Sequence, residues 1–302
     1  MPITHIFLAI LVATIWGLNF IFIKLSLIEF HPLLLGSLRF ILASVPAILF
    51  IKPPSMPFKL VVLYGVVMFA IQFTFLFVGM HVGMTPGMAS LIMQVQVFFS
   101  IFFAYIALGE IPKLMQIIGA LISFIGIGLV SLHLDQNNIT FLGFICVLVA
   151  ATAWGLGNLI IKMNNKTNMI SLVIWGNFVA FIPMVILTLI VEGPSSIIYS
   201  YNHISIIGIS SLLYTVCLST WVGYISWNWL LSKYPMGTIV PFTLLVPVVG
   251  MLSSVLIMKE PFESWKIFTS ILVITGLYIN IMSTRYYYNK IKLSNKIKTE
   301  TM

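Results

Sequence analysis

The residues best suited to contact a ligand are a few polar side chains inside otherwise apolar stretches. Arg39 is the one formal charge deep in such a stretch, and a guanidinium can hold a carboxylate through parallel hydrogen bonds. Asn19, Gln72, Gln94 and Asn158 add amides that can donate or accept hydrogen bonds. Together they suit a small zwitterion, with the arginine for its carboxylate and the amides for its ammonium. The alternative is structural, because such residues also form interhelical hydrogen bonds or snorkel to the surface.

Aromatic side chains form a second group of candidates. Tyr214, Trp221 and Tyr224 recur at a helical spacing and predict an aromatic stripe along one face of a helix. Inside an apolar environment a tyrosine hydroxyl or an indole N–H needs a hydrogen-bond partner, which a wet central cavity would supply. Plain packing is the alternative explanation for this stripe.

No catalytic or metal-binding pattern accompanies these residues. The chain lacks the His-Glu-x-x-His, Gly-x-Ser-x-Gly and Gly-x-x-x-x-Gly-Lys patterns. Its two cysteines, Cys146 and Cys217, have no metal-ligand spacing and indicate no disulfide framework. We therefore expect a protein that is not an enzyme, with no catalytic residues, no metal and no cofactor.

The elements that must carry the candidate residues are membrane-spanning helices. Hydrophobic residues make up 60% of the 302 residues and charged residues only 7%, whereas a soluble domain carries about 25% charged residues. A barrel would need strands alternating with a period of two, and nothing here alternates in that way. Helices need about 20 apolar residues each to cross a bilayer. We expect ten such spans, with 192–203 as the longest loop, at 4–28, 32–51, 60–80, 86–108, 114–132, 139–161, 169–191, 204–231, 236–258 and 265–284.

The two halves of the chain repeat each other. Residues 13–24 and 151–162 lie 138 positions apart and share a Trp-Gly-Leu motif and a closing lysine. Glu110 and Glu260, which close spans 4 and 9, are 150 positions apart. Five spans in each half is an odd number, so the second half must be inverted relative to the first. We predict an all-α integral membrane protein of ten transmembrane helices in two inverted five-helix repeats, 1–133 and 139–284, with a basic cytoplasmic tail at 285–302.

The distribution of basic residues predicts the orientation. The face that holds both termini collects eleven lysine and arginine residues, and the opposite face has only Lys24, Lys259 and Lys266. Because basic loops stay on the cytoplasmic side, both termini should be cytoplasmic in a multi-pass protein of the inner membrane. The net charge of +8 then reflects topology and a basic tail near anionic headgroups, and nucleic-acid binding is not expected.

Several motifs carry a resemblance to a known family. They are Trp16-Gly-Leu-Asn-Phe20, Gln72-Phe-Thr-Phe-Leu-Phe77, Leu91-Ile-Met-Gln-Val-Gln-Val-Phe-Phe99, Ser171-Leu-Val-Ile-Trp175, Leu244-Leu-Val-Pro-Val-Val-Gly250 and Gly276-Leu-Tyr-Ile-Asn280. With the ten-span layout, they make the chain resemble the drug/metabolite transporter superfamily, and within it the EamA-type exporters of O-acetylserine and cysteine. The resemblance adds Trp175 to the candidates for substrate binding.

The expected function follows from both lines of argument. The repeat predicts a secondary transporter that works by alternating access, and the resemblance implies export of neutral amino acids of the cysteine pathway. The alternative is a multidrug or lipophilic-cation exporter, in which a quaternary ammonium binds by cation–π contact to Trp16, Trp154 or Trp221. The expected partners are a small-molecule substrate and the lipid bilayer, with a homodimer left open.

The driving force is a separate expectation. No Asp, Glu or His lies in the interior of any expected span, although proton-coupled transporters typically bury such groups. We therefore expect flux to be driven by the gradient of the transported solute itself, or by exchange.

Overall fold

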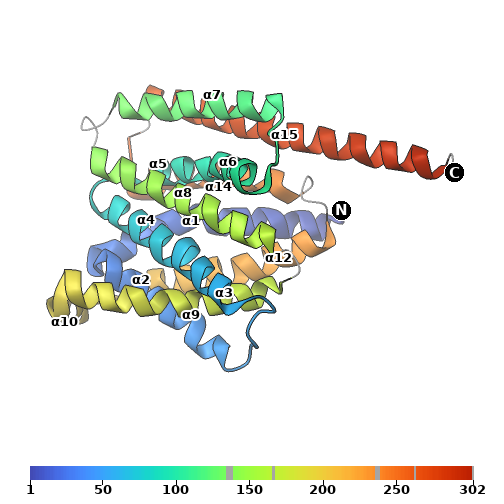
Figure 1. The fold of residues 1–302 in the computed structure, drawn as a ribbon. Coiled ribbons are helices and arrows are strands. Elements are labelled where there is room, and N and C mark those ends of the chain that lie inside the picture. The colour runs from blue at the N-terminus through green and yellow to red at the C-terminus, as the bar shows by residue number, and fades with distance from the viewer. Residues whose placement is uncertain (134–138, 165–166, 235–238, 262, 301–302) are drawn as a thin grey trace.

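The computed structural model describes residues 1–133, 139–164, 167–234, 239–261 and 263–300, and each regular element within them is a helix (Figure 1). The longer elements are α1 Ile3–Glu29, α2 Pro32–Ile48, α4 Gln72–His81, α6 Gln96–Leu108, α7 Leu114–Ser131, α8 Phe141–Met163, α9 Met169–Leu187, α10 Gly193–His203, α12 Tyr224–Lys233, α14 Leu245–Met258 and α15 Ser264–Glu300. The shorter ones are α3 Phe58–Tyr64, η1 Gly65–Ile71, α5 Pro86–Ile92, η2 Met93–Val95, η3 Thr188–Glu192, α11 Ile206–Leu213, η4 Tyr214–Gly223 and η5 Val240–Leu244.

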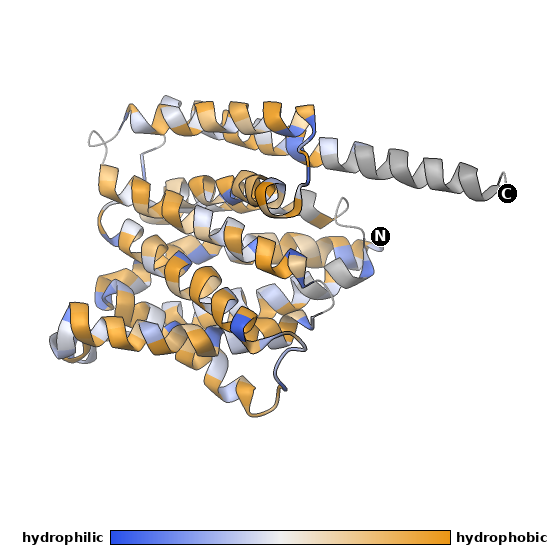
Figure 2. Cartoon of the chain, in the orientation of Figure 1, coloured by the Kyte–Doolittle hydropathy of each residue, from blue (hydrophilic) through white to orange (hydrophobic). Residues whose placement is uncertain are grey.

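The helices have the length and composition of membrane spans. Among the described residues, eight are long and apolar enough to cross a bilayer, and two shorter apolar helices, Pro32–Ile48 and Phe242–Met258, accompany them. Figure 2 shows hydrophobic residues along the helices and hydrophilic ones mainly near their ends and in the loops. Large apolar side chains such as Phe102 and Ile182 are exposed on the outside, which a protein surrounded by lipid can accommodate.

One expected loop is a helix instead, so that expectation was wrong. Residues 193–203 form α10, directly after the π-helical segment η3. Gly193 has a φ of +72°, a conformation that glycine adopts without steric cost and that ends the preceding helix. Pro194 then occupies the first turn of α10, where its missing N–H removes no helical hydrogen bond. At the other end of the chain, α15 continues past the expected span to Glu300.

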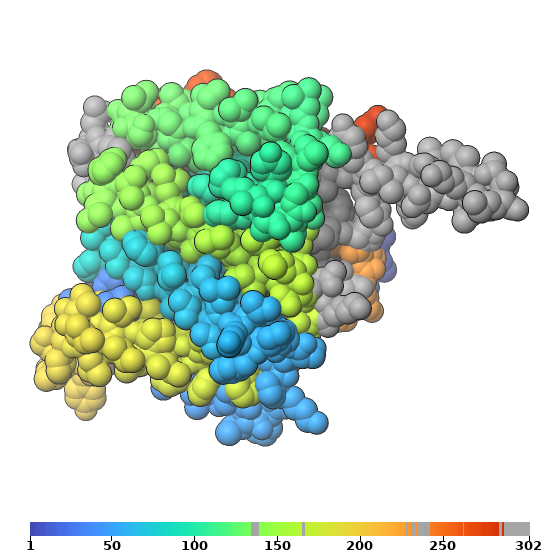
Figure 3. All heavy atoms as spheres, viewed as in Figure 1, coloured from blue at the N-terminus to red at the C-terminus, as the bar shows by residue number. Residues whose placement is uncertain are grey.

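The bundle is held together by contacts between the two halves of the chain. α2 packs against α9, α7 against α15, α1 against α14, and α8 against α4 and α6 (Figure 1). On the face seen in Figure 3, α9 lies beside the segment formed by α3 and η1. The interior of the bundle is a buried cluster of aromatic and aliphatic side chains that includes Phe40, Phe69, Phe73 and Phe77.

The glycines of the two Trp-Gly motifs permit two of these close contacts. A Cβ atom on Gly17 would lie 2.6 Å from Cβ of Val249 in α14, and one on Gly155 would lie 2.7 Å from Cβ of Phe99 in α6. Both distances are shorter than any normal van der Waals contact, so each motif requires glycine for helix packing. The same small residue therefore brings α1 close to α14 and α8 close to α6.

Five of the expected spans contain a helical stretch that is not α-helical. The third, seventh and eighth carry the π-helical segments η1, η3 and η4, and the fourth and ninth carry the 3-10 segments η2 and η5. In η4 the hydroxyl of Thr220 donates to the carbonyl oxygen of Thr215, five residues earlier, at 2.9 Å. Such segments change the register of side chains along a helix and are frequent at functional sites.

Candidate functional site

Arg39 of α2 is the centre of the candidate site. Its side chain is only 2% exposed, and its Nη2 atom donates to the hydroxyl of Thr220 at 3.2 Å. Its Cζ atom lies 4.2 Å from the centre of the Phe73 ring, which covers one face of the guanidinium. The Nε and Nη1 atoms are buried and have no hydrogen-bond acceptor. A buried charge with one neutral partner is costly unless an anion completes its environment.

Aromatic side chains from three other elements lie in the same part of the bundle as this arginine. Trp221 donates from Nε1 to the carbonyl oxygen of Ala43 at 3.0 Å, one turn beyond Arg39 on α2. Tyr224 lies four residues after Thr220, and its ring centre lies 5.5 Å from that of Trp16 on α1. The structure thus brings four of the expected residues, from α1, α2, η4 and α12, into one neighbourhood.

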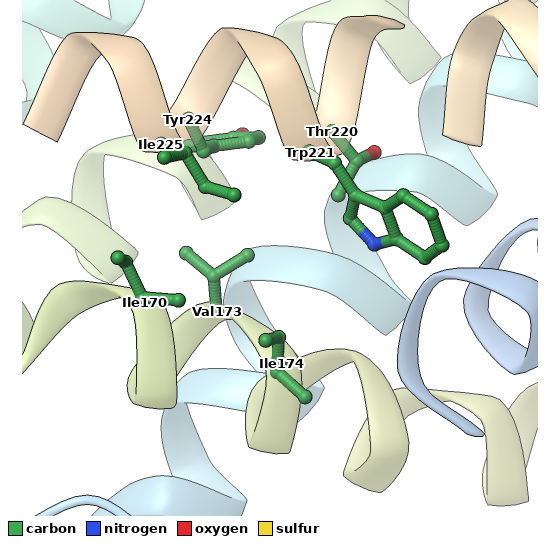
Figure 4. Close-up of a pocket in the computed structure, with 7 residues that line it drawn as sticks. All are labelled: Ile170, Val173, Ile174, Thr220, Trp221, Tyr224 and Ile225. Atoms are coloured by element: carbon green, nitrogen blue, oxygen red, sulfur yellow. The ribbon is translucent and has the colours of Figure 1, made fainter. Parts of the chain in front are cut away.

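A narrow crevice opens beside this group. α9 provides Ile170, Val173 and Ile174 on one side, and η4 and α12 provide Thr220, Trp221 and Tyr224 on the other. Figure 4 shows the two sets of side chains pointing toward each other across the gap. The free space has room for little more than one water-sized group. Thr220 lines the crevice and also holds Arg39, so the crevice and the guanidinium adjoin.

Buried amide groups form a second polar set in the bundle. Asn19 is 7% exposed, Gln72 is 2% exposed and Asn177 is 1% exposed. The side-chain oxygen of each has no hydrogen-bond donor, although Asn177 donates from Nδ2 to the carbonyl oxygen of Val173 at 2.7 Å. Unpaired carbonyl oxygens inside an apolar bundle are suited to accept from an ammonium group or from water.

Other expected site residues have structural partners elsewhere. Trp175 donates to the carbonyl oxygen of Ile51 at 3.1 Å. Asn158 donates to the amide oxygen of Gln96 at 2.7 Å, and the neighbouring Gln94 is buried in η2.

Two aromatic candidates also have packing roles. The hydroxyl of Tyr214 donates to the carbonyl oxygen of Ile15 at 3.0 Å, and its ring stacks on Phe22. Trp154 is half-buried against the main hydrophobic cluster. The structure therefore does not bring these two, or Trp175 and Asn158, to the guanidinium of Arg39.

Three residues of the site were not among the expected ones. Thr220 directly precedes Trp221, Phe73 directly follows Gln72, and Asn177 lies four residues after Val173 on α9. The signal for Phe73 and Asn177 was their position inside apolar spans near candidates already chosen. Thr220 lies four residues before Tyr224 in the same span, so its place beside the aromatic stripe was the signal that could have found it.

Comparisons with known proteins agree with this architecture. The model of the EamA-like transporter family matches two stretches of the chain, residues 3–132 and 141–282. A probable amino-acid metabolite efflux pump of Escherichia coli is 38% identical over 284 residues, which cover 92% of this chain and 95% of that protein. A probable amino-acid metabolite efflux pump of Salmonella typhimurium is 36% identical over the same coverage. One solved crystal structure aligns with a TM-score of 0.62 over 95% of this chain and 99% of its own, and at 15% identity it supports the fold alone.

Proposed function

Because the chain belongs to the EamA-like transporter family, we propose that it is a secondary transporter that exports small amphipathic metabolites by alternating access. Neutral amino acids of the cysteine pathway, such as cysteine and O-acetylserine, are the proposed substrates. Two relatives with 36–38% identity are named as probable amino-acid metabolite efflux pumps, which supports amino acids as the substrate class.

The observation that carries this proposal is the set of buried polar atoms without partners. Arg39 offers donors, whereas Asn19, Gln72 and Asn177 offer acceptors, and all four side chains are buried. A zwitterionic amino acid has the complementary groups, since its carboxylate accepts and its ammonium donates. A lipophilic cation would satisfy the amide oxygens or the aromatic rings but would leave the arginine without an anion. The drug-export alternative is therefore the less favoured one.

The internal duplication supports alternating access. The family model matches each half separately, and Gly17 and Gly155 make equivalent close contacts with α14 and α6. These features fit ten spans arranged as two inverted five-helix repeats, which can adopt two mirror-related states around one central site. The narrow crevice beside Arg39 fits a state in which that site is not open to a bulky solute.

Efflux from reconstituted liposomes tests the function. Liposomes that contain the purified protein are loaded with a mixed pool of amino acids and with lipophilic cations, and the external medium is analysed over time. We expect neutral amino acids to leave faster than from protein-free liposomes, while the cations are retained equally in both. Release of the cations alone would instead support the drug-export alternative.

The proposed location is the inner membrane, with both termini in the cytoplasm. Single cysteines introduced at the exposed positions Lys113 and Tyr201 test this orientation with a membrane-impermeant thiol reagent. In intact cells from which the outer membrane barrier has been removed, we expect labelling at Tyr201 and protection at Lys113. Labelling at Lys113 and protection at Tyr201 would show the opposite orientation, with both termini outside the cytoplasm.

A further inference from the structure

The site places an incompletely paired arginine next to an apolar crevice. Arg39 takes part in neither of the ion pairs Lys162–Glu110 and Lys266–Glu260. Its Nε and Nη1 atoms are buried without an acceptor. A guanidinium in such a place matches a carboxylate better than any neutral group, because it can donate several hydrogen bonds in one plane.

The crevice next to this donor set has a different chemistry. Four of its lining residues, Ile170, Val173, Ile174 and Ile225, are aliphatic, and in Figure 4 Val173 points from α9 toward Tyr224. A charged or amide side chain would lose its hydration there without gaining a partner. The free space suits a group of about the size of a water molecule, such as a methyl or a thiol.

We infer that Arg39 binds the substrate's α-carboxylate, that Thr220 positions the guanidinium, and that the adjoining crevice takes the substrate's side chain. The substrate class is then an α-amino acid with a free carboxylate and a short, uncharged side chain, such as alanine or cysteine. Val173 and Ile174 limit the size of that side chain. This inference rests on the proposed function, and it specifies which part of the substrate each part of the site recognises.

Competition against the unmodified protein tests the carboxylate subsite. Proteoliposomes take up labelled L-alanine by counterflow, and the competitors are L-cysteine, L-alaninamide and ethylamine. Cysteine should compete as well as unlabelled alanine, and the two compounds without a carboxylate should compete at least about tenfold less well, because they leave the arginine unpaired. Equal competition by L-alaninamide would overturn the inference and would leave the proposed function standing. If no amino acid is transported at all, the proposed function fails first.

Variants test the two subsites separately. Arg39→Gln should raise the half-saturating concentration of alanine about 10- to 100-fold, and Arg39→Lys should raise it less because the charge remains. Val173→Ala widens the crevice and should improve competition by L-leucine relative to L-alanine about tenfold. The matched control is Ile182→Ala on the same helix, where the side chain is 48% exposed on the outside of the bundle. An unchanged leucine-to-alanine ratio in Val173→Ala would refute the crevice as the side-chain subsite.

Discussion

The ammonium group of Lys162 pairs with the carboxylate of Glu110 and joins the end of α8 to the connection after α6. The equivalent residues of the sequence repeat, Lys24 and Glu260, do not meet in this way. Lys24 donates at 2.9 Å to a backbone carbonyl of α4, and Glu260 pairs at 3.0 Å with the buried Lys266. One lysine–glutamate pair of the duplicated set is therefore formed, and the residues of the other have different partners.

We expect the Lys162–Glu110 pair to stabilise the present state and a Lys24–Glu260 pair to stabilise its mirror-related state. Glu110→Lys replaces attraction by repulsion and should slow transport about two- to fivefold, the range expected for a half-exposed pair. Combining it with Lys162→Glu restores the attraction and should restore the rate, while Lys59→Glu, on an exposed lysine of α3, serves as the control. A double variant as slow as Glu110→Lys alone would contradict this role.

A cross-linking experiment examines the mirror-related state directly. Cysteines that replace Lys24 and Glu260 should form a disulfide during turnover in the presence of alanine. They should form it more slowly without substrate, because the present state gives these positions other neighbours. Equal cross-linking rates under both conditions would mean that the distance between the two positions does not change in the transport cycle.

Transport should continue without a proton gradient. The carboxylates of the described residues lie at helix ends, where Glu29 accepts from the backbone N–H of Ser205 at 2.8 Å and Glu192 from that of Leu33 at 2.7 Å. Uptake of labelled L-alanine into inverted membrane vesicles is measured with and without an imposed pH difference, and the two rates of uptake should be equal. Strict dependence on the gradient, lost in Glu110→Gln, would show proton coupling instead.

Thr220→Val tests how the guanidinium is positioned. The substitution keeps the shape of the side chain but removes the hydroxyl that accepts from Arg39 Nη2 at 3.2 Å. The loss of one such hydrogen bond is worth about 1 kcal/mol, so KM for alanine should rise about fivefold with kcat little changed. Thr220→Ser, which keeps the hydroxyl, should have the same KM as the unmodified protein. A fall in kcat alone would indicate a role in the conformational change rather than in binding.

Glu192 should stabilise the fold by capping α2. Its two carboxylate oxygens accept from the backbone N–H groups of Leu33 at 2.7 Å and Leu34 at 3.0 Å, at the positive end of the helix dipole. Glu192→Gln should lower the free energy of unfolding by about 1–3 kcal/mol, measured as a reduced thermal midpoint in detergent. Glu110→Gln, which removes a half-exposed pair, should cost less than about 1 kcal/mol.

Much of the fold could be predicted from the sequence because membrane helices are set by length and hydrophobicity. The expected span 86–108 and the helical stretch Pro86–Leu108 coincide. The turn into α10 was missed because a short polar stretch between spans is compatible with either a loop or a helix. The positive φ of Gly193, which composition does not reveal, marks the break before α10.

The site was predicted less completely, because one sequence does not reveal how each helix is turned about its own axis relative to its neighbours. Asn158 could have faced the cavity, but it pairs with Gln96, since nothing in one sequence specifies which neighbour an amide will meet. Thr220 was missed because a hydroxyl inside an apolar helix usually bonds to a carbonyl of its own helix, as this one does to Thr215. Only the fold shows that it also accepts from Arg39.

Arg39 also has a consequence for the direction of net flow. Its guanidinium is enclosed with two nitrogens that have no acceptor in the protein, and burial of an unpaired ion costs several kcal/mol. In the proposed alternating-access cycle, the change of state removes the water that would lessen this cost, so we expect the return step to be slow when no substrate is bound. When the substrate's carboxylate is bound to Arg39, the guanidinium is paired, and this cost does not arise in either conformational step. We therefore expect this transporter to exchange one solute for another faster than it carries out net efflux.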